Sequence, residues 1–149
     1  MIRATPLYHL IRMSTDENLT KRVLDCGAGG KMPPLYLFHS LGYETAGIEI
    51  DDGQIAKART FCKANDVELN IQKGDMRGLP FDDDSFGVVY SYNSIFHMTK
   101  ADIAASIHEM IRVLQWGGLC YFNLLSVEDG DCGEGREINA GEFIQEEGD

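Results

Sequence analysis

The chain contains no apolar run that approaches the length of a membrane-spanning helix. Such a helix needs about 20 consecutive, mainly apolar residues, and no stretch of the 149 residues meets this requirement. The first six residues also lack the apolar core of a secretory signal peptide. These two absences predict a cytoplasmic protein that is not embedded in a membrane.

Basic residues are scarce. Lys and Arg number 13 against 24 Asp and Glu, so that the formal net charge is −11 at neutral pH. Nucleic-acid binding depends on neutralising phosphates with Lys and Arg, and binding to anionic membranes needs the same charges. The excess of negative charge therefore predicts neither a nucleic-acid partner nor a membrane partner.

The four cysteines are too widely spaced for a paired metal site or a redox motif. Cys26, Cys62, Cys120 and Cys132 form no CxxC pair and no zinc pattern. Cys26 and Cys120 lie in apolar, strand-like runs, where cysteine behaves as a small hydrophobic residue. We therefore expect no metal site and a reducing compartment.

What the sequence does have is a regular alternation of strand and helix patterns. The predicted strands cover residues 23–26, 45–50, 67–71, 86–92 and 119–125. The predicted helices cover residues 33–41, 51–62 and 99–116, the last of them ending at Gly117 and Gly118. This alternation predicts one domain over residues 1–149 with a parallel sheet covered by helices on both faces. Ligands of such folds bind beyond the carboxyl ends of the strands.

A glycine-rich loop follows the first predicted strand, with the sequence Asp25-Cys26-Gly27-Ala28-Gly29-Gly30-Lys31. Glycine lets the backbone turn sharply and approach a ligand closely. A P-loop is excluded, because Met32 follows the Gly-Lys pair and Asp25 stands where the first glycine belongs. A dinucleotide fingerprint fits poorly, because Met32 replaces its third small residue and Pro33 and Pro34 remove N–H groups that would bind pyrophosphate.

The same loop suits a positively charged ligand. The carboxylate of Asp25 would repel an anion but would attract an ammonium or a sulfonium group by Coulomb's law. S-adenosylmethionine carries both groups. The alternative is a tight strand-to-helix turn that binds nothing, because short glycine motifs also occur without a ligand.

Acidic side chains also end the next two predicted strands. Glu49 could accept hydrogen bonds from both ribose hydroxyls, and Ile50 beside it could pack on an adenine face. Asp75 could accept a hydrogen bond from an adenine amino group, and Met76 could cover the ring. The alternative for Glu49 is a solvated strand-end carboxylate, and the alternative for Asp75 is a turn or helix-capping residue.

The order of these segments resembles the class I S-adenosylmethionine-dependent methyltransferases, in particular the small-molecule enzymes of methyltransferase type 11. The matching motifs are VLDCGAG at 23–29, GIEID at 47–51, GDMRGLPFDDDSF at 74–86 and IRVLQWGG at 111–118. The resemblance spans about residues 20–126. It implies a Rossmann-like, doubly wound α/β fold of about five mainly parallel strands, S-adenosylmethionine as the cofactor, and methyl transfer to a small-molecule acceptor.

The residues that would hold the cofactor lie at the ends of the first four predicted strands. They are Asp25, Gly27, Ala28, Gly29, Glu49, Ile50, Asp75, Met76, Tyr90 and Ser91. His97 is a candidate general base for an acceptor that must lose a proton, although we prefer to interpret it as a polar residue flanking a helix.

Two other functional classes remain as alternatives to an enzyme of this kind. One is a non-catalytic module that binds S-adenosylmethionine. The other is a nicotinamide oxidoreductase, which Asp25, Met32 and the two prolines disfavour.

The ends of the chain depart from the family. Residues 1–20 offer only a short helical lead-in, at 7–13, where family members carry a helical lid. Residues 127–149 form an acidic, glycine-rich tail in which we expect no closing pair of strands, since only residues 142–145 could pair. We therefore expect a chain truncated at its C-terminus, with the fifth strand at an open sheet edge. Such an edge invites a partner chain or a second copy of this one.

Overall fold

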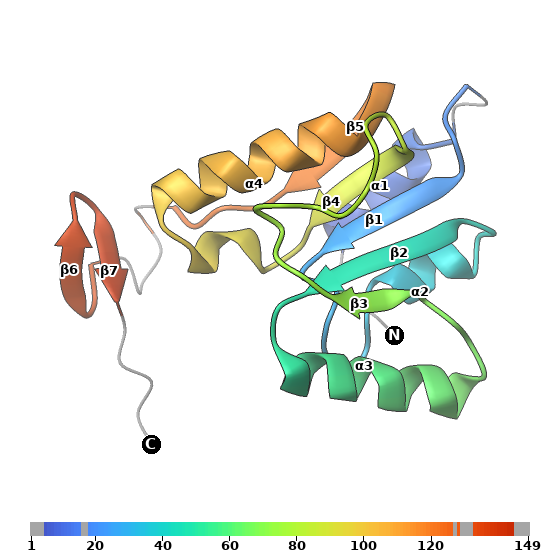
Figure 1. The fold of residues 1–149 in the computed structure, drawn as a ribbon, viewed down its shortest axis with the longest axis horizontal. Coiled ribbons are helices and arrows are strands. Elements are labelled where there is room, and N and C mark those ends of the chain that lie inside the picture. Colours follow the sequence, from blue (N-terminus) through green and yellow to red (C-terminus); the bar gives the residue numbers. More distant parts are fainter. Residues whose placement is uncertain (1–4, 16–17, 127, 129–132, 145–149) are drawn as a thin grey trace.

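The computed structural model describes residues 5–15, 18–126, 128 and 133–144. Its centre is a five-stranded sheet in which every neighbouring pair of strands is parallel. Helices cover both faces of this sheet (Figure 1). The predicted doubly wound α/β fold with its parallel sheet is therefore confirmed.

Strands and helices alternate along most of the chain, as the sequence pattern predicts, and only the third and fourth strands of the sheet follow one another with no helix between them. The strands of the sheet are β1 (Arg22–Cys26), β2 (Glu44–Glu49), β3 (Ile71–Lys73), β4 (Phe86–Ser91) and β5 (Leu114–Phe122). They lie side by side in the order β3-β2-β1-β4-β5. The helices are α1 (Thr5–Met13), α2 (Leu35–His39), α3 (Asp52–Asn65) and α4 (Lys100–Val113), with a short 3-10 turn, η1 (Ile95–His97), before α4.

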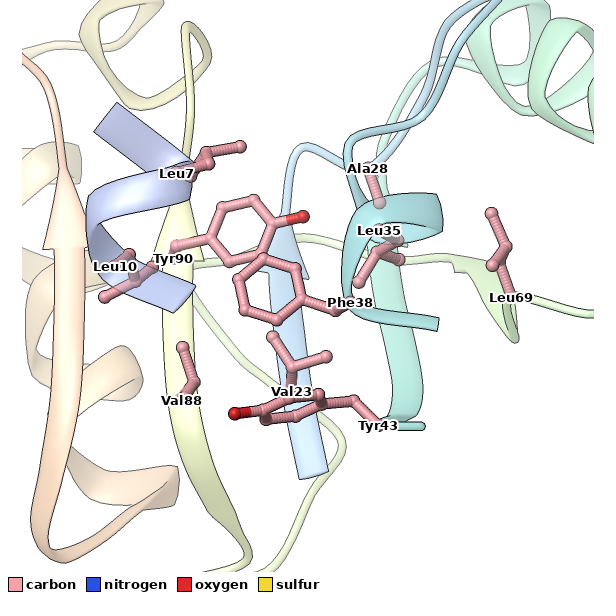
Figure 2. Close-up of a cluster of buried hydrophobic side chains, with 10 residues drawn as sticks. All are labelled: Leu7, Leu10, Val23, Ala28, Leu35, Phe38, Tyr43, Leu69, Val88 and Tyr90. Carbon is pink, nitrogen blue, oxygen red and sulfur yellow. The ribbon is translucent and has the colours of Figure 1, made fainter. Parts of the chain in front are cut away.

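β1 and β4 are buried on both faces of the sheet. Successive residues of a strand point to opposite faces, and in these two strands each face meets an apolar cluster. Val23 of β1 belongs to a cluster under α1 and α2, whereas Leu24 belongs to a second cluster under α4. Figure 2 shows the first cluster, in which the ring of Tyr90 stacks on that of Phe38 with centroids 5.3 Å apart. Apolar packing on both faces therefore holds β1 and β4 in place.

Side-chain caps start the two long helices. The Asp51 carboxylate accepts a hydrogen bond from the backbone N–H of Gln54 at 2.7 Å, and α3 begins at the next residue. The Thr99 hydroxyl accepts one from the N–H of Asp102 at 3.2 Å at the start of α4. Both caps satisfy amide groups that have no partner inside the helix, and both lie at the first residues of the predicted helices, 51 and 99.

The end of α4 differs from the prediction. The helix ends at Val113, and β5 begins at Leu114 instead of 119. Leu114 continues the apolar stripe of the helix but is already extended, and it packs against the same cluster from the strand. Gly117 and Gly118 lie in an irregular part of β5, where the register with β4 shifts. A Cβ on Gly118 would lie 2.7 Å from Leu114 Cδ1, so these glycines serve this bulge and do not terminate the helix.

The third strand starts later than the alternation of apolar residues suggests. β3 comprises Ile71–Lys73, not residues 67–71. Asn70 has a left-handed backbone with φ of 53°, which interrupts the extended conformation. Leu69 is buried in the first cluster even though it lies outside the strand. Its burial explains why the alternating pattern extended further back than the strand.

We expected no closing pair of strands in the C-terminal tail, and among the described residues no strand of the tail joins the five-stranded sheet. The tail does, however, contain a short pair of strands of its own. β6 (Arg136–Asn139) and β7 (Glu142–Ile144) form an antiparallel hairpin, with Gly141 at φ of 69° in the turn. The hairpin forms its own two-stranded sheet and does not extend the five-stranded one. Its tip contacts α4, because Glu142 Oε1 accepts a hydrogen bond from the backbone N–H of Lys100 at 2.5 Å.

β5 lies at one edge of the five-stranded sheet. Among the residues described, no strand pairs with its outer side, so its outward N–H and C=O groups are open to another chain. A partner for the β5 edge stays a prediction.

None of the described helices is both long enough and apolar enough to cross a bilayer.

We predict that the chain self-associates through the β5 edge. Light scattering should give a mass above the 16.6 kDa of one chain, and Cys120→Lys, at an exposed position of β5, should lower it because edge charges block strand pairing. Thr60→Lys on the exposed surface of α3 is the control. A parent protein that is monomeric at high concentration contradicts this prediction.

Candidate functional site

The carboxyl ends of β1, β2 and β3 are tied together by backbone hydrogen bonds. The N–H groups of Gly27 and Ala28 both donate to the carbonyl of Ile48, at 2.8 and 3.0 Å. The N–H of Gly74 donates to the carbonyl of Glu49 at 3.0 Å. The glycine loop and the loops after the next two strands therefore share one edge of the sheet, as expected for a doubly wound fold.

Two positions of the glycine loop leave no room for a side chain. Gly27 has φ of 101°, and a Cβ there would lie 2.0 Å from Ser94 Oγ and 3.8 Å from Met76 Cε. A Cβ on Gly29 would lie 2.4 Å from Gln54 Cβ and 2.7 Å from Glu49 Oε2. The loops after β1, β3 and β4 thus converge at Gly27, and only glycine allows this approach.

Glu49 holds the glycine loop to the start of α3. Its Oε2 accepts a hydrogen bond from the N–H of Gly29, and its Oε1 accepts one from the N–H of Asp51, both at 3.0 Å. Each carboxylate oxygen can accept more than one hydrogen bond, so that the carboxylate can still receive two hydroxyl groups. Ile50 beside it is 60% exposed, a large apolar side chain open to a flat ligand.

Asp25 is a buried carboxyl group without a hydrogen-bond partner among the described residues. It is 1% exposed, and neither of its oxygens is bonded. Burial raises the pKa of Asp25 to about 8; the nearby Tyr90 hydroxyl lowers it in part, and the charge of Glu49 raises it further. The Tyr90 hydroxyl does not reach hydrogen-bonding geometry, since it too is unbonded. An unpaired buried carboxyl is unfavourable, and a cationic ligand would relieve it.

Asp75 is paired with a residue that the sequence reasoning missed. Its carboxylate accepts hydrogen bonds from the backbone N–H and the guanidinium of Arg77, and these bonds lower the pKa of Asp75. Arg77 also bonds Asp102 in α4, at 3.1 Å. An arginine two residues after an acidic turn residue was the available signal. Met76 is partly buried against the second cluster, with its methyl group near Gly27.

Three predicted cofactor residues have fully buried side chains. Ala28 and Tyr90 belong to the first apolar cluster, and Figure 2 shows the Tyr90 ring enclosed by Leu7 and Phe38. Ser91 is buried, and its hydroxyl has no hydrogen-bond partner among the described residues. The N–H of Ala28 is already bonded, so its carbonyl is the polar group that remains. Contact of these three residues with a cofactor stays a prediction.

His97 ends the short turn η1 and is exposed. Its backbone N–H donates to the carbonyl of Ser94 at 3.2 Å, and its ring lies 4.5 Å from that of Phe96. The imidazole makes no hydrogen bond with another described residue that would fix its orientation. Its role as a general base stays a prediction.

No cluster of three or more His, Cys, Asp or Glu side chains in the described part of the chain could hold a metal ion. Residues 24–122, by contrast, match the family model of a methyltransferase domain. The chain belongs to this family. With its parallel sheet and glycine loop, it is a class I S-adenosylmethionine-dependent methyltransferase domain, as the resemblance implied.

Known methyltransferases and one solved structure show the extent of the similarity. (+)-O-methylkolavelool synthase of Herpetosiphon aurantiacus is 28% identical over 124 residues, which cover 80% of this chain and 42% of that protein. Tocopherol O-methyltransferase of Arabidopsis thaliana is 30% identical over 122 residues, covering 76% and 34%. The crystal structure of the PH0226 protein from Pyrococcus horikoshii superposes with a TM-score of 0.72 at 27% identity, covering 82% and 56%. The methyltransferase domain described here thus spans between 34% and 56% of the length of these three proteins.

We predict opposite effects of Asp25→Asn on stability and on cofactor binding. The folded-state pKa of about 8 lies above the ordinary 3.8, so the folded protein keeps a proton that the unfolded chain loses between these values. The stability from this group is complete below pH 4 and is lost as the pH rises to 8. Replacement of Asp25 by Asn removes this loss of stability at higher pH. The Tm of the ligand-free variant should therefore exceed that of the parent by a margin that grows from pH 4 to pH 8.

The same variant should bind S-adenosylmethionine about 10- to 150-fold more weakly, because a hydrogen bond to a charged group is lost. Calorimetry and thermal unfolding measure the two effects. Asp82→Asn, at an exposed position, is the control. Unchanged affinity in Asp25→Asn would mean that this carboxyl does not meet the cofactor.

Glu49→Ala and Asp75→Ala should each weaken cofactor binding without unfolding the domain. The expected loss is about 2- to 12-fold for each hydrogen bond removed, measured by calorimetry. Glu44→Ala is a matched control, because Glu44 is the carboxylate at the other end of β2, exposed and paired with Arg22. If both site variants bind like the parent, the ribose and adenine are placed wrongly.

Proposed function

We propose that this chain binds S-adenosylmethionine at the carboxyl ends of β1, β2 and β3 and transfers its methyl group to a small-molecule acceptor. The observation that carries this proposal is the buried, unpartnered carboxyl of Asp25 at the start of a glycine loop. A cationic ligand favours the ionised form of this carboxyl, whereas the phosphates of NAD or ATP would disfavour its ionisation.

The residues of the site fit the separate parts of this cofactor. Asp25 would receive the ammonium group of the methionine part, and Glu49 the two ribose hydroxyls. Asp75 would accept from the adenine amino group, with Ile50 and Met76 against the faces of the ring. The support is chemical: each carboxylate can accept further hydrogen bonds, and the two apolar side chains lie next to the carboxylates in the chain.

The bound cofactor supplies a methyl group that is already activated by its positive sulfur. The protein therefore has to hold two reactants in line and keep water away. The glycine loop, which Gly27 and Gly29 allow to pack closely against the neighbouring loops, would present its backbone to the ligand. His97 would serve as a general base only for an acceptor that loses a proton.

The names of the relatives support a small-molecule acceptor. (+)-O-methylkolavelool synthase and tocopherol O-methyltransferase are named for the methylation of small organic compounds. For this chain the acceptor class is a proposal, and a module that binds the cofactor without catalysis is the alternative. We also propose a reducing, cytoplasmic location, supported by three described cysteines that are free thiols: Cys26, Cys62 and Cys120.

We predict that S-adenosylmethionine and S-adenosylhomocysteine bind at least about 10-fold more tightly than NAD or ATP. Calorimetry with the purified chain measures these affinities. Equal or tighter binding of NAD would overturn the proposal. A turnover assay with isotope-labelled methyl donor against a metabolite library then separates an enzyme from a binding module, since only the enzyme releases S-adenosylhomocysteine in step with a methylated product.

A further inference from the structure

The loop after β4, residues 92–97, lies against the glycine loop. Ser94 is the closest contact, since its Oγ occupies the space next to the Cα of Gly27. The Ser94 hydroxyl has no hydrogen bond to another described residue, and the side chain is partly buried. Residues 92–97 therefore form a wall of the site, and the position of this wall depends on how the loop is held.

The loop leaves β4 through a strained residue. Asn93 has φ of 54°, in the left-handed region that only glycine adopts freely. Asparagine tolerates this conformation better than most residues when its side chain is bonded.

Asn123 provides this bond from the neighbouring strand end. The N–H of Asn93 donates to Oδ1 of Asn123, and Nδ2 of Asn123 donates to Oδ1 of Asn93, each at 2.8 Å. Asn123 directly follows β5, and Ser91 of β4 pairs with Phe122 of β5 in the sheet. The two asparagines therefore meet just beyond the last paired residues, where they close the two strand ends together.

The other end of the loop is fixed by burial. Ile95 is fully buried in the second cluster, under α4. The carbonyl of Ser94 accepts a hydrogen bond from the N–H of His97. Ser94 is thus held between the asparagine pair on one side and the apolar anchor on the other.

We propose that Asn93 and Asn123 are positioning residues, whose reciprocal amide pair fixes residues 92–97 as a wall of the cofactor site and sets Ser94 against the glycine loop. This inference rests on the proposed function for the identity of the ligand. A wall that is ordered before binding raises affinity, because the ligand does not have to order it. Loss of the pair weakens cofactor binding through loop order and leaves Asp25, Glu49 and Asp75 untouched.

Three variants separate the parts of the pair. Asn123→Ala removes both hydrogen bonds. Asn93→Gly keeps the left-handed backbone and the bond from its N–H, and it loses the Oδ1 acceptor alone. Asn93→Ala loses the same acceptor and also strains the backbone. Asn70→Gly is the matched control, since Asn70 is also left-handed, with φ of 53°, and is bonded to Thr45 away from this loop.

The first measurement is amide hydrogen exchange of residues 92–98 in the free protein, followed by mass spectrometry. Exchange should be about 5- to 100-fold faster in Asn123→Ala and about 2- to 10-fold faster in Asn93→Gly. Asn93→Ala should exceed Asn93→Gly. The double variant with Asn93→Gly and Asn123→Ala should exchange no faster than Asn123→Ala alone, because the two residues act as a unit. Asn70→Gly should leave this segment unchanged.

The second measurement is the affinity for S-adenosylhomocysteine by calorimetry, with thermal unfolding as the check of the fold. The loss of affinity should follow the same order as the gain in exchange. Unchanged exchange in Asn123→Ala overturns the inference, and so does faster exchange with unchanged affinity. A parent chain that does not bind S-adenosylhomocysteine overturns the proposed function instead. A parent that binds, with variants of equal affinity, overturns only the role of the asparagine pair.

Discussion

The carboxylate of Glu49 is the interaction on which the site depends. It accepts hydrogen bonds from the N–H groups of Gly29 and Asp51, and so it joins the glycine loop after β1 to the residue that caps α3. Neither segment has a core of its own, because one is glycine and the other is a helix end. The N–H of Gly30 also donates to the carbonyl of Gln54 at 3.0 Å, so this backbone bond and the Glu49 side chain together set the relative position of the two segments. Glu49 itself lies at the end of β2, which pairs with β1 and β3.

The domain tolerates an unfavourable group at this edge. A buried carboxyl without a partner is rare in folded proteins. Asp25 is nevertheless part of β1, which packs into both apolar clusters through Val23 and Leu24. The apolar packing of β1 and β4 is thus what allows an unsatisfied polar group to persist beside the glycine loop. The same two strands therefore stabilise the core and hold the side chain of Asp25 at the site.

Sequence patterns predicted the features that are local, and missed those that need distant partners. The caps at Asp51 and Thr99 involve residues three positions apart, so the chain shows them directly. The pairing of Arg77 with Asp102 and of Asn93 with Asn123 joins residues 25 and 30 positions apart, and no local pattern indicates it. The start of β5 was misplaced because Leu114 satisfies the helical spacing and the strand register equally.

The hydrogen bonds from Arg77 to Asp75 have a consequence for which purine the site would accept. They keep Asp75 ionised by lowering the pKa of that carboxyl, and an ionised carboxylate can accept hydrogen bonds but cannot donate them. In the proposed placement, a purine with an amino group at this edge gains a hydrogen bond, whereas hypoxanthine or guanine would present a carbonyl oxygen to a negative charge. The turn after β3 would therefore discriminate between purines by the direction of a single hydrogen bond.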